Sequence, residues 1–191
     1  MTGIGAAMAG GNPRIGRQGQ DWYPTPNAVT TALLDVWEPV SATVWEPACG
    51  DGVMARVIQD AGYDVIATDL IDRGHGTGGV DFLSTKKRAA DCLVTNPPFD
   101  LAGQFIRHAF ALGVKEMALV LKSTYWHAKG RKHLYDDHTP SLVMPLLWRP
   151  DFLGLGRPTM EVMWCVWDSR PGPRPIYLPL DRPAVKQGRL L

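Results

Sequence analysis

The four residues Asn96-Pro97-Pro98-Phe99 carry the most specific chemistry in this chain. An amino group conjugated to an aromatic heterocycle is a weak nucleophile, because its lone pair is delocalised into the ring. The side-chain oxygen of Asn96 and the backbone carbonyl of Pro97 can each accept one amino proton, in a turn that two successive prolines stiffen. These hydrogen bonds draw the nitrogen toward tetrahedral geometry, while Phe99 stacks on the ring. The segment therefore predicts attack of a planar aromatic amine on an electrophilic carbon.

The residues in front of this segment indicate how it is positioned. Residues 91–96 are mostly apolar with β-branched side chains, which predicts a buried strand that delivers the turn at its carboxyl end. An Asn-Pro pair also marks turns in ordinary loops, and this alternative stays open for the segment taken alone. A second motif that could bind the ligand carrying the electrophilic carbon is needed to decide between a reactive turn and a plain loop.

A glycine-containing motif upstream is a candidate for this ligand-binding motif. It reads Trp45-Glu46-Pro47-Ala48-Cys49-Gly50-Asp51-Gly52. An apolar strand leads into it, Gly50 and Gly52 allow a tight turn and a close approach to a ligand, and apolar spacing predicts a helix over 53–61. A strand, a glycine loop and a helix in this order form a nucleotide-type crevice. Because Glu46 and Asp51 would repel phosphates and the lysine of a Walker sequence is missing, the loop favours a cationic ligand.

Two further acidic positions follow predicted strands. Asp69 comes seventeen positions after Gly52, close to the spacing at which such crevices place a carboxylate on ribose hydroxyls. Asp69 is therefore the candidate ribose ligand. Asp81 and Phe82 would place a carboxylate and an aromatic ring beside an adenine. An acid before a hydrophobic pair is also common at strand ends in general, so the second assignment keeps this alternative.

The order of these motifs resembles that of S-adenosylmethionine-dependent adenine-N6 DNA methyltransferases, specifically the small kind found in phages and prophages. The segments that carry the resemblance are, in chain order, Trp22-Tyr23-Pro24-Thr25-Pro26, 46–52, Asp69, Asp81-Phe82 and Asn96-Pro97-Pro98-Phe99. It implies S-adenosylmethionine as cofactor and DNA, expected to be double-stranded, as substrate. The implied catalytic residues are Asn96, Pro97, Pro98 and Phe99. The implied cofactor-binding residues are Tyr23, Thr25, Pro26, Glu46, Ala48, Cys49, Gly50, Gly52, Asp69, Leu70, Asp81, Phe82 and Asn96.

The resemblance also assigns parts of the cofactor to these residues. Tyr23, Thr25 and Pro26 are expected to help close over its methionine end. The glycine loop is expected to surround the cofactor, with Asp69 on its ribose and the 81–82 pair at its adenine.

The predicted elements alternate along the chain. Strands are expected near 43–46, 63–68, 91–95, 115–121, 141–147 and 161–167, and helices near 27–36, 53–61, 101–112 and 129–135. Such alternation predicts an α/β protein whose ligands lie beyond the carboxyl ends of its strands. The resemblance implies the Rossmann-like class I methyltransferase fold, with a mostly parallel seven-stranded sheet, helices on both faces and an antiparallel last strand. The candidate for that strand is 161–167, paired with 141–147.

Composition fits one packed domain with loose ends. The chain has 191 residues, of which 45% are hydrophobic and 20% charged, enough for one domain and too few for two. Residues 1–20 are predicted to form a flexible N-terminal arm, 21–170 the catalytic domain and 171–191 a proline-rich tail without packed elements. No run of eighteen apolar residues and no secretory leader is visible, so a soluble, cytoplasmic protein is expected.

The cysteines and histidines indicate no metal site. Cys49, Cys92 and Cys165 are odd in number and widely spaced, which favours buried free thiols over a disulfide framework or a zinc site. The five histidines show no metal-binding spacing, and no metal is assigned. The formal net charge of +1 argues against a protein that coats nucleic acid through bulk charge.

A basic segment after the fourth predicted strand is the first candidate substrate surface. Its cations are Lys122, Lys129, Arg131 and Lys132, with no acid among them. Tyr125 and Trp126 lie between these cations. Such a stretch is expected to hold phosphates while the aromatic rings meet unstacked bases. The alternative is a solvated helix face with two ordinary core aromatics.

The connection over 148–158 is the second candidate substrate surface. Its glycines allow mobility, and Arg149 can reach phosphates. Trp148 or Phe152 would form the opposite face of a base pocket whose first face is Phe99. Phe152 is favoured, because an exposed aromatic beside a glycine suits this role better than one at a strand end.

The predicted reaction is direct in-line transfer of a methyl group to the amine of a base swung out of the duplex. Cytosine-C5 enzymes need a cysteine after a proline, whereas here Phe99 follows the prolines and no Pro-Cys pair exists. Methylation of RNA adenines or of protein glutamine amides remains an alternative, since these amines pose the same electronic problem. A non-catalytic regulator or partner subunit that binds the cofactor is the other alternative.

Overall fold

The computed structural model describes residues 23–169, 172 and 174–184. Its centre is one seven-stranded sheet in the order β2-β1-β3-β4-β6-β5-β7. The strands are β1 Thr43–Glu46, β2 Asp64–Ala67, β3 Cys92–Thr95, β4 Glu116–Lys122, β5 Leu142–Pro145, β6 Val162–Trp167 and β7 Ile176–Tyr177. Strands β1 to β4 are parallel, and β6 runs antiparallel between β4 and β5. Pro47 directly follows β1, and Pro145 is the last residue of β5, which fits the positions that proline takes at strand ends.

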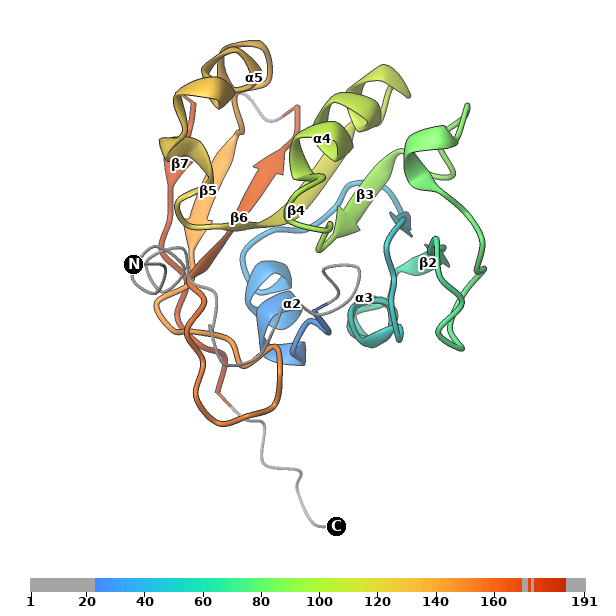
Figure 1. The fold of residues 1–191 in the computed structure, drawn as a ribbon, viewed down its shortest axis with the longest axis horizontal. Coiled ribbons are helices and arrows are strands. Elements are labelled where there is room, and N and C mark those ends of the chain that lie inside the picture. Colours follow the sequence, from blue (N-terminus) through green and yellow to red (C-terminus); the bar gives the residue numbers. More distant parts are fainter. Residues whose placement is uncertain (1–22, 170–171, 173, 185–191) are drawn as a thin grey trace, which may run out of the picture.

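Helices cover both faces of the sheet. They are α2 Asn27–Leu34, α3 Val53–Asp60, α4 Ala102–Ala111 and α5 Lys132–Asp137, with short 3-10 turns η2 Phe82–Ser84, η3 Tyr125–His127 and η4 Lys129–Arg131. Figure 1 shows α2 and α3 on one face and α4 and α5 on the other. The α/β fold predicted from the alternation is confirmed, as are the mostly parallel seven-stranded sheet and the antiparallel strand at 161–167 that the resemblance implied; this strand, β6, is followed in the chain by β7.

Two hydrophobic cores, one on each face, explain why the strands read as nearly continuous apolar runs. In β4 the side chains of Ala118 and Val120 belong to the core under α2 and α3, which we call the first core. Met117, Leu119 and Leu121 belong to the core under α4 and α5, the second core. This alternation follows from the two-residue period of a strand that is buried on both sides.

The predicted strands agree with the observed ones to within two residues at each end. The predicted helix over 129–135 is instead the turn η4 followed by α5. β7 was not predicted, because it lies in the proline-rich segment that was expected to hold no packed element. Leu180 in that segment is only 3% exposed and bridges to Leu146. The expected arm at 1–20 and Trp22 lie outside the described residues.

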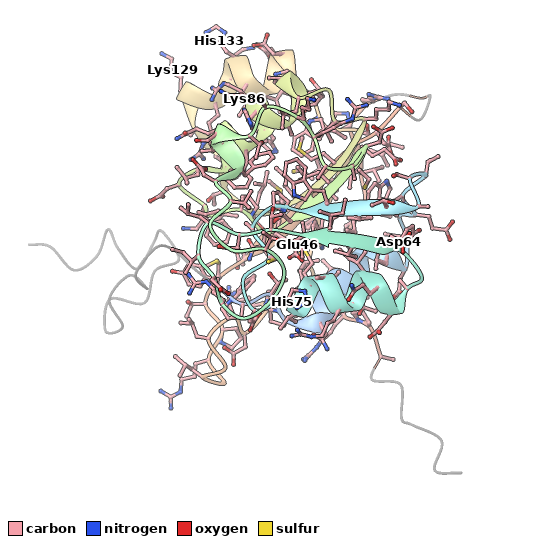
Figure 2. All side chains as sticks on the ribbon, turned by 90° about the vertical axis from the view of Figure 1, so that its right-hand side faces the viewer. Glu46, Asp64, His75, Lys86, Lys129 and His133 are labelled. Atoms are coloured by element: carbon pink, nitrogen blue, oxygen red, sulfur yellow. The ribbon has the colours of Figure 1, made fainter. Side chains whose placement is uncertain are left out.

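The parallel strands bring the sequence motifs to one edge of the sheet. Glu46 ends β1, Asp69 follows β2, and Asn96 follows β3. Figure 2 shows Glu46 and Asp64 at opposite ends of the neighbouring strands β1 and β2. The candidate site is therefore at the carboxyl edge, where α/β sheets hold ligands.

No helix in the described part of the chain is long and apolar enough to cross a lipid bilayer. The same residues contain no cluster of three or more side chains suited to hold a metal ion.

Candidate active site

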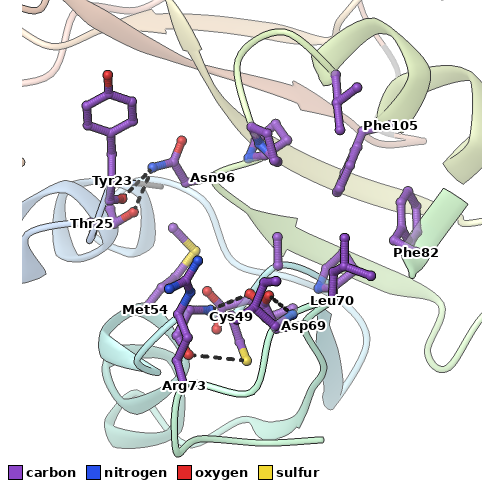
Figure 3. A pocket seen from close by; sticks show the side chains of 18 of the residues that line it. Tyr23, Thr25, Cys49, Met54, Asp69, Leu70, Arg73, Phe82, Asn96 and Phe105 are labelled. Carbon is purple, nitrogen blue, oxygen red and sulfur yellow. Dashed lines mark hydrogen bonds between the residues drawn. The ribbon is translucent and has the colours of Figure 1, made fainter. Parts of the chain in front are cut away.

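A cavity lies at the carboxyl edge of β1, β2 and β3. The sequence-predicted residues that line it are Tyr23, Thr25, Glu46, Ala48, Cys49, Gly50, Asp69, Leu70, Asp81, Phe82, Asn96, Pro97 and Pro98. Figure 3 shows Asn96 and Thr25 at one end of the cavity and the ring of Phe82 at the other. Pro26 and Gly52 belong to the same segments but are not among the lining residues. The motifs that were widely separated in the sequence thus converge on one space.

Asp69 fixes the shape of the glycine loop. One of its carboxylate oxygens accepts a hydrogen bond from the backbone amide of Gly50 at 2.8 Å, and the other accepts one from Ile71 at 2.8 Å. Gly52 has a φ of +79°, and a β-carbon there would lie 2.1 Å from the ring of His75. The loop therefore needs glycine at position 52 for its turn and its packing, even though Gly52 does not face the cavity.

Glu46 is a buried acid beside this loop, with an exposed fraction of 2%. Burial raises the pKa of its carboxyl well above the usual range. A hydrogen bond from the Ala55 backbone amide lowers this pKa in part, the charges of Asp69 and Asp51 raise it, and the charge of Arg56 lowers it. Its Oε2 atom is buried and has no hydrogen-bond partner among the described residues. An unsatisfied buried acceptor costs about 1–3 kcal/mol, so this oxygen suits a ligand that brings a donor.

The end of the cavity at Phe82 is apolar. Phe82 is 2% exposed and packs against Trp45 and Phe105, with ring centroids 5.2 and 4.6 Å apart. Asp81 caps η2 by accepting hydrogen bonds from the Leu83 amide and a neighbouring serine. Leu70 is 61% exposed although it lines the cavity, which leaves an apolar surface for a flat ring.

Asn96 is held in one orientation. Its Nδ2 atom donates to the backbone carbonyl of Tyr23 at 3.2 Å and to Oγ1 of Thr25 at 3.0 Å. Both amide protons are thus committed to the segment that starts α2. The Oδ1 atom is buried and has no hydrogen-bond partner among the described residues. This leaves an acceptor, and no donor, for a ligand amine.

Phe99 is not open to the cavity, in contrast to its predicted role as an available stacking face. Its ring is 7% exposed and belongs to the first core. The ring of Tyr23 lies 5.8 Å from it, and the Lys122 ammonium lies 5.0 Å above it. Phe99 remains a candidate base-stacking residue only if one of these neighbours moves.

Phe152 differs from its prediction in the same way. It was favoured as an exposed aromatic, but it is 6% exposed and belongs to the same core as Phe99. Its ring lies 6.3 Å from that of Tyr23. Trp148 is half-buried against this core, and Arg149 is exposed and paired with Glu161. A loop residue becomes buried here because the loop folds back over the first core, which its glycine-rich sequence does not indicate.

Tyr125 and Trp126 lie on the opposite face of the sheet from Phe99 and Phe152. Tyr125 is 4% exposed and carries the Arg131 guanidinium over its ring at 4.1 Å. Both aromatics pack with the second core, and Trp126 donates to the sulfur of Cys165. This packing favours the alternative in which they are ordinary core aromatics. Figure 2 shows Lys129 far from Glu46.

Arg73 is a cavity residue that the sequence reasoning missed. It belongs to the loop between Asp69 and Asp81, and it is the only lysine or arginine among the described lining residues. Figure 3 shows its side chain rising from that loop into the cavity. Its position between two acidic motifs, in a loop rich in glycine, was the signal available in the sequence.

The three cysteines are buried free thiols, as predicted. Burial, followed by the charges of Glu46 and Asp69, raises the pKa of the Cys49 thiol to about 12. Burial also raises the pKa of Cys165 to about 12. A thiol with such a pKa is not a nucleophile near neutral pH, so the cavity offers no covalent catalyst of this kind.

The chain has the fold of class I S-adenosylmethionine-dependent methyltransferases. A Listeria monocytogenes protein described as a member of that class matches with a TM-score of 0.57 and 13% identity, over 87% of this chain and 68% of that one. The methyltransferase subunit of a type I restriction-modification system from Streptococcus thermophilus matches with a TM-score of 0.57 and 13% identity, over 93% of this chain and 53% of that one. The 23S rRNA methyltransferase ErmE matches with a TM-score of 0.51 and 13% identity, over 78% and 71%.

This chain therefore spans about half the length of the restriction-modification subunit. No protein-family model matches the sequence, and no curated protein matches it.

Proposed function

We propose that this protein is a methyltransferase that uses S-adenosylmethionine to methylate the N6 amino group of adenine in DNA. The observation that carries the proposal is the fixed orientation of Asn96. Its Nδ2 is committed to Tyr23 and Thr25, so its buried Oδ1 is left as an acceptor. An arrangement with an acceptor and no donor fits a substrate amine and does not fit a carbonyl.

The polar groups of the cavity fit the proposed cofactor, which supplies a methyl group activated on a positively charged sulfur. Glu46 offers a buried oxygen for the ammonium of its methionine part. Asp69 follows β2 at the carboxyl edge of the sheet, where it would receive the ribose hydroxyls. Arg73 is the cation that would meet the carboxylate of the methionine part.

In the proposed reaction, the residues of this chain position the amine and localise its lone pair. Asn96 Oδ1 and the Pro97 carbonyl each accept one amine proton. The nitrogen forms its bond to the donated carbon, the electron pair of the broken carbon–sulfur bond stays on sulfur, and the surplus proton leaves to solvent. No thiol is needed for this route, in keeping with the raised pKa of Cys49.

Two observations favour a nucleic-acid base over a protein amide as substrate. The rings of Tyr23, Phe99 and Phe152 form an aromatic cluster beside Asn96, in which Phe99 and Phe152 are buried. Once one ring of this cluster is displaced, a flat heterocycle would use the remaining stacking faces better than an aliphatic glutamine chain would. The match to a restriction-modification subunit supports DNA, and the match to an rRNA methyltransferase keeps RNA as the second candidate.

The proposal is tested by incubating the full chain with methyl-labelled S-adenosylmethionine and, separately, DNA, RNA or protein. The labelled substrate is then hydrolysed and analysed by mass spectrometry. We expect label in DNA as N6-methyladenine, and no label with Asn96→Ala. Label only in RNA or glutamine would overturn the substrate assignment while keeping the amine chemistry. Cofactor binding without transfer to any of the three would favour the non-catalytic alternative.

A further inference from the structure

Tyr23 packs against both of the aromatic rings that were predicted to hold the base. Its ring centroid lies 5.8 Å from that of Phe99 at an interplanar angle of 38°, and 6.3 Å from that of Phe152 at 76°. Phe99 and Phe152 are only 7% and 6% exposed. A base cannot stack on either ring in this arrangement, because an intercalated ring needs van der Waals contact with exposed faces on both sides.

A movement of the main chain at Tyr23 cannot make room for a base between the aromatic rings. Its carbonyl accepts a hydrogen bond from Asn96 at 3.2 Å, and Thr25, two residues later, accepts the other. The flanking prolines Pro24 and Pro26 restrict the backbone further. A shift of this segment would release the amide that orients the amine acceptor. Rotation about the side-chain bonds of Tyr23 moves the ring and leaves both hydrogen bonds intact.

We propose that the ring of Tyr23 occupies the place of the substrate base in the free protein and turns out when a planar heterocycle enters between Phe99 and Phe152. This inference rests on the proposed function, because it assumes that the base approaches Asn96 from this side. An entering aromatic ring replaces the contacts that the tyrosine gives up. A thin aliphatic side chain does not replace them, so Tyr23 makes the site selective for flat rings.

The test uses the full-length protein saturated with S-adenosylhomocysteine, so that free adenine cannot bind in the cofactor's own adenine site. Adenine is titrated into wild type, Tyr23→Ala and Tyr23→Phe by calorimetry. We expect Tyr23→Ala to bind adenine about tenfold more tightly or better, because the entering ring no longer displaces a buried one. Tyr23→Phe keeps the ring and should stay closer to the wild type than Tyr23→Ala does.

A matched control and a matched ligand sharpen the result. Tyr63 packs against the same core but precedes β2 at the opposite edge of the sheet, so Tyr63→Ala should leave adenine affinity unchanged. Purine lacks the amino group and should show the same gain in Tyr23→Ala, whereas the preference for adenine over purine should vanish when Asn96→Ala is added. Tyr23→Leu replaces Tyr23→Ala if the alanine variant does not fold.

The outcomes separate the two proposals. A folded Tyr23→Ala or Tyr23→Leu variant that binds S-adenosylhomocysteine normally but adenine no more tightly than wild type would overturn the role of Tyr23 and leave the proposed function in place. Failure of the wild type to bind S-adenosylhomocysteine would count against the proposed function itself.

Discussion

The two halves of the cavity are built in opposite ways. The half around the glycine loop presents polar atoms that keep hydrogen-bonding capacity, such as the buried Oε2 of Glu46. The half beyond Asn96 is bounded by Tyr23, whose ring packs against the buried rings of Phe99 and Phe152, and these two do not line the cavity. Aromatic rings around an empty apolar pocket pack against one another, because dense packing is favourable. Charged groups do not fill an empty polar pocket in this way, because they would lose their contact with water. Changes in the first half should therefore alter cofactor affinity, and changes in the second should alter substrate entry and turnover.

The largest expected effect is in the second half, at Asn96. Asn96→Ala removes the acceptor that localises the amine lone pair, and we expect the rate of methyl transfer to fall by about 100- to 1,000-fold. Cofactor affinity, measured by calorimetry, should change little. Thr25→Val is the control, because it removes one of the two groups that hold Asn96 and should cost about tenfold in rate. Transfer by Asn96→Ala at the wild-type rate would exclude the proposed role.

Asp69 should give the largest effect in the first half. Asp69→Ala removes the two hydrogen bonds that shape the loop at Gly50 and Ile71. We expect S-adenosylhomocysteine to bind about 10- to 100-fold more weakly, as for the loss of charge-assisted hydrogen bonds. Asp64→Ala changes an exposed acid at the other end of the same strand and should have no effect. Equal losses in both variants would mean that net charge, and not the loop, sets the affinity.

Arg73 permits a more selective test of the first half. Arg73→Ala should weaken binding of S-adenosylhomocysteine by about tenfold, since one charge-assisted contact to the carboxylate is lost. Binding of decarboxylated S-adenosylmethionine should be the same in wild type and variant. Arg107→Ala serves as the control, because Arg107 is exposed on α4 and does not line the cavity. A loss of equal size for both ligands would show that Arg73 supports the loop and does not read the carboxylate.

The smallest expected effect depends on pH and concerns Glu46. Its raised pKa means that the folded free protein holds this proton more tightly than the unfolded chain does. The free energy of unfolding of the free protein should thus fall as pH rises above the usual carboxyl pKa toward the raised one. Glu46→Gln removes this loss, and its melting temperature near pH 8 should exceed that of wild type by about 2–4 °C.

Folding of the free protein favours protonated Glu46, whereas binding of the cofactor should favour ionised Glu46. A cationic ligand favours the ionised carboxylate, so wild-type affinity should increase with pH up to the raised pKa, and calorimetry in two buffers should detect proton release. The charged groups that act electrostatically on the Glu46 carboxyl are Asp69, Asp51 and Arg56. Glu46→Gln should bind more weakly and without proton release. Identical pH profiles in the two proteins would show that Glu46 does not titrate on binding.

The sequence was sufficient to predict that the acidic and amide residues of the polar half meet at one edge of the sheet. Glu46, Asp69 and Asn96 each follow a short apolar run, and parallel strands bring such positions to one edge. The aromatic half could not be read in the same way. The burial of Phe152 depends on contacts with Tyr23 and with a core built from distant segments, and no local pattern encodes them. β7 was missed for a related reason, since two residues among prolines show no periodicity.

The position of β6 has a consequence for how this chain is made. Among the described strands, β5 pairs only with β6 and β7, and β4 pairs with β6 on its outer side. During synthesis, the edge of β4 that pairs with β6 therefore has no hydrogen-bonding partner until β6, which ends at residue 167, has left the ribosome. Sheets that depend on such distant pairing fold slowly, and a bare strand edge attracts other chains. Expression at low temperature, which gives the late strands time to arrive, should raise the yield of monodisperse protein.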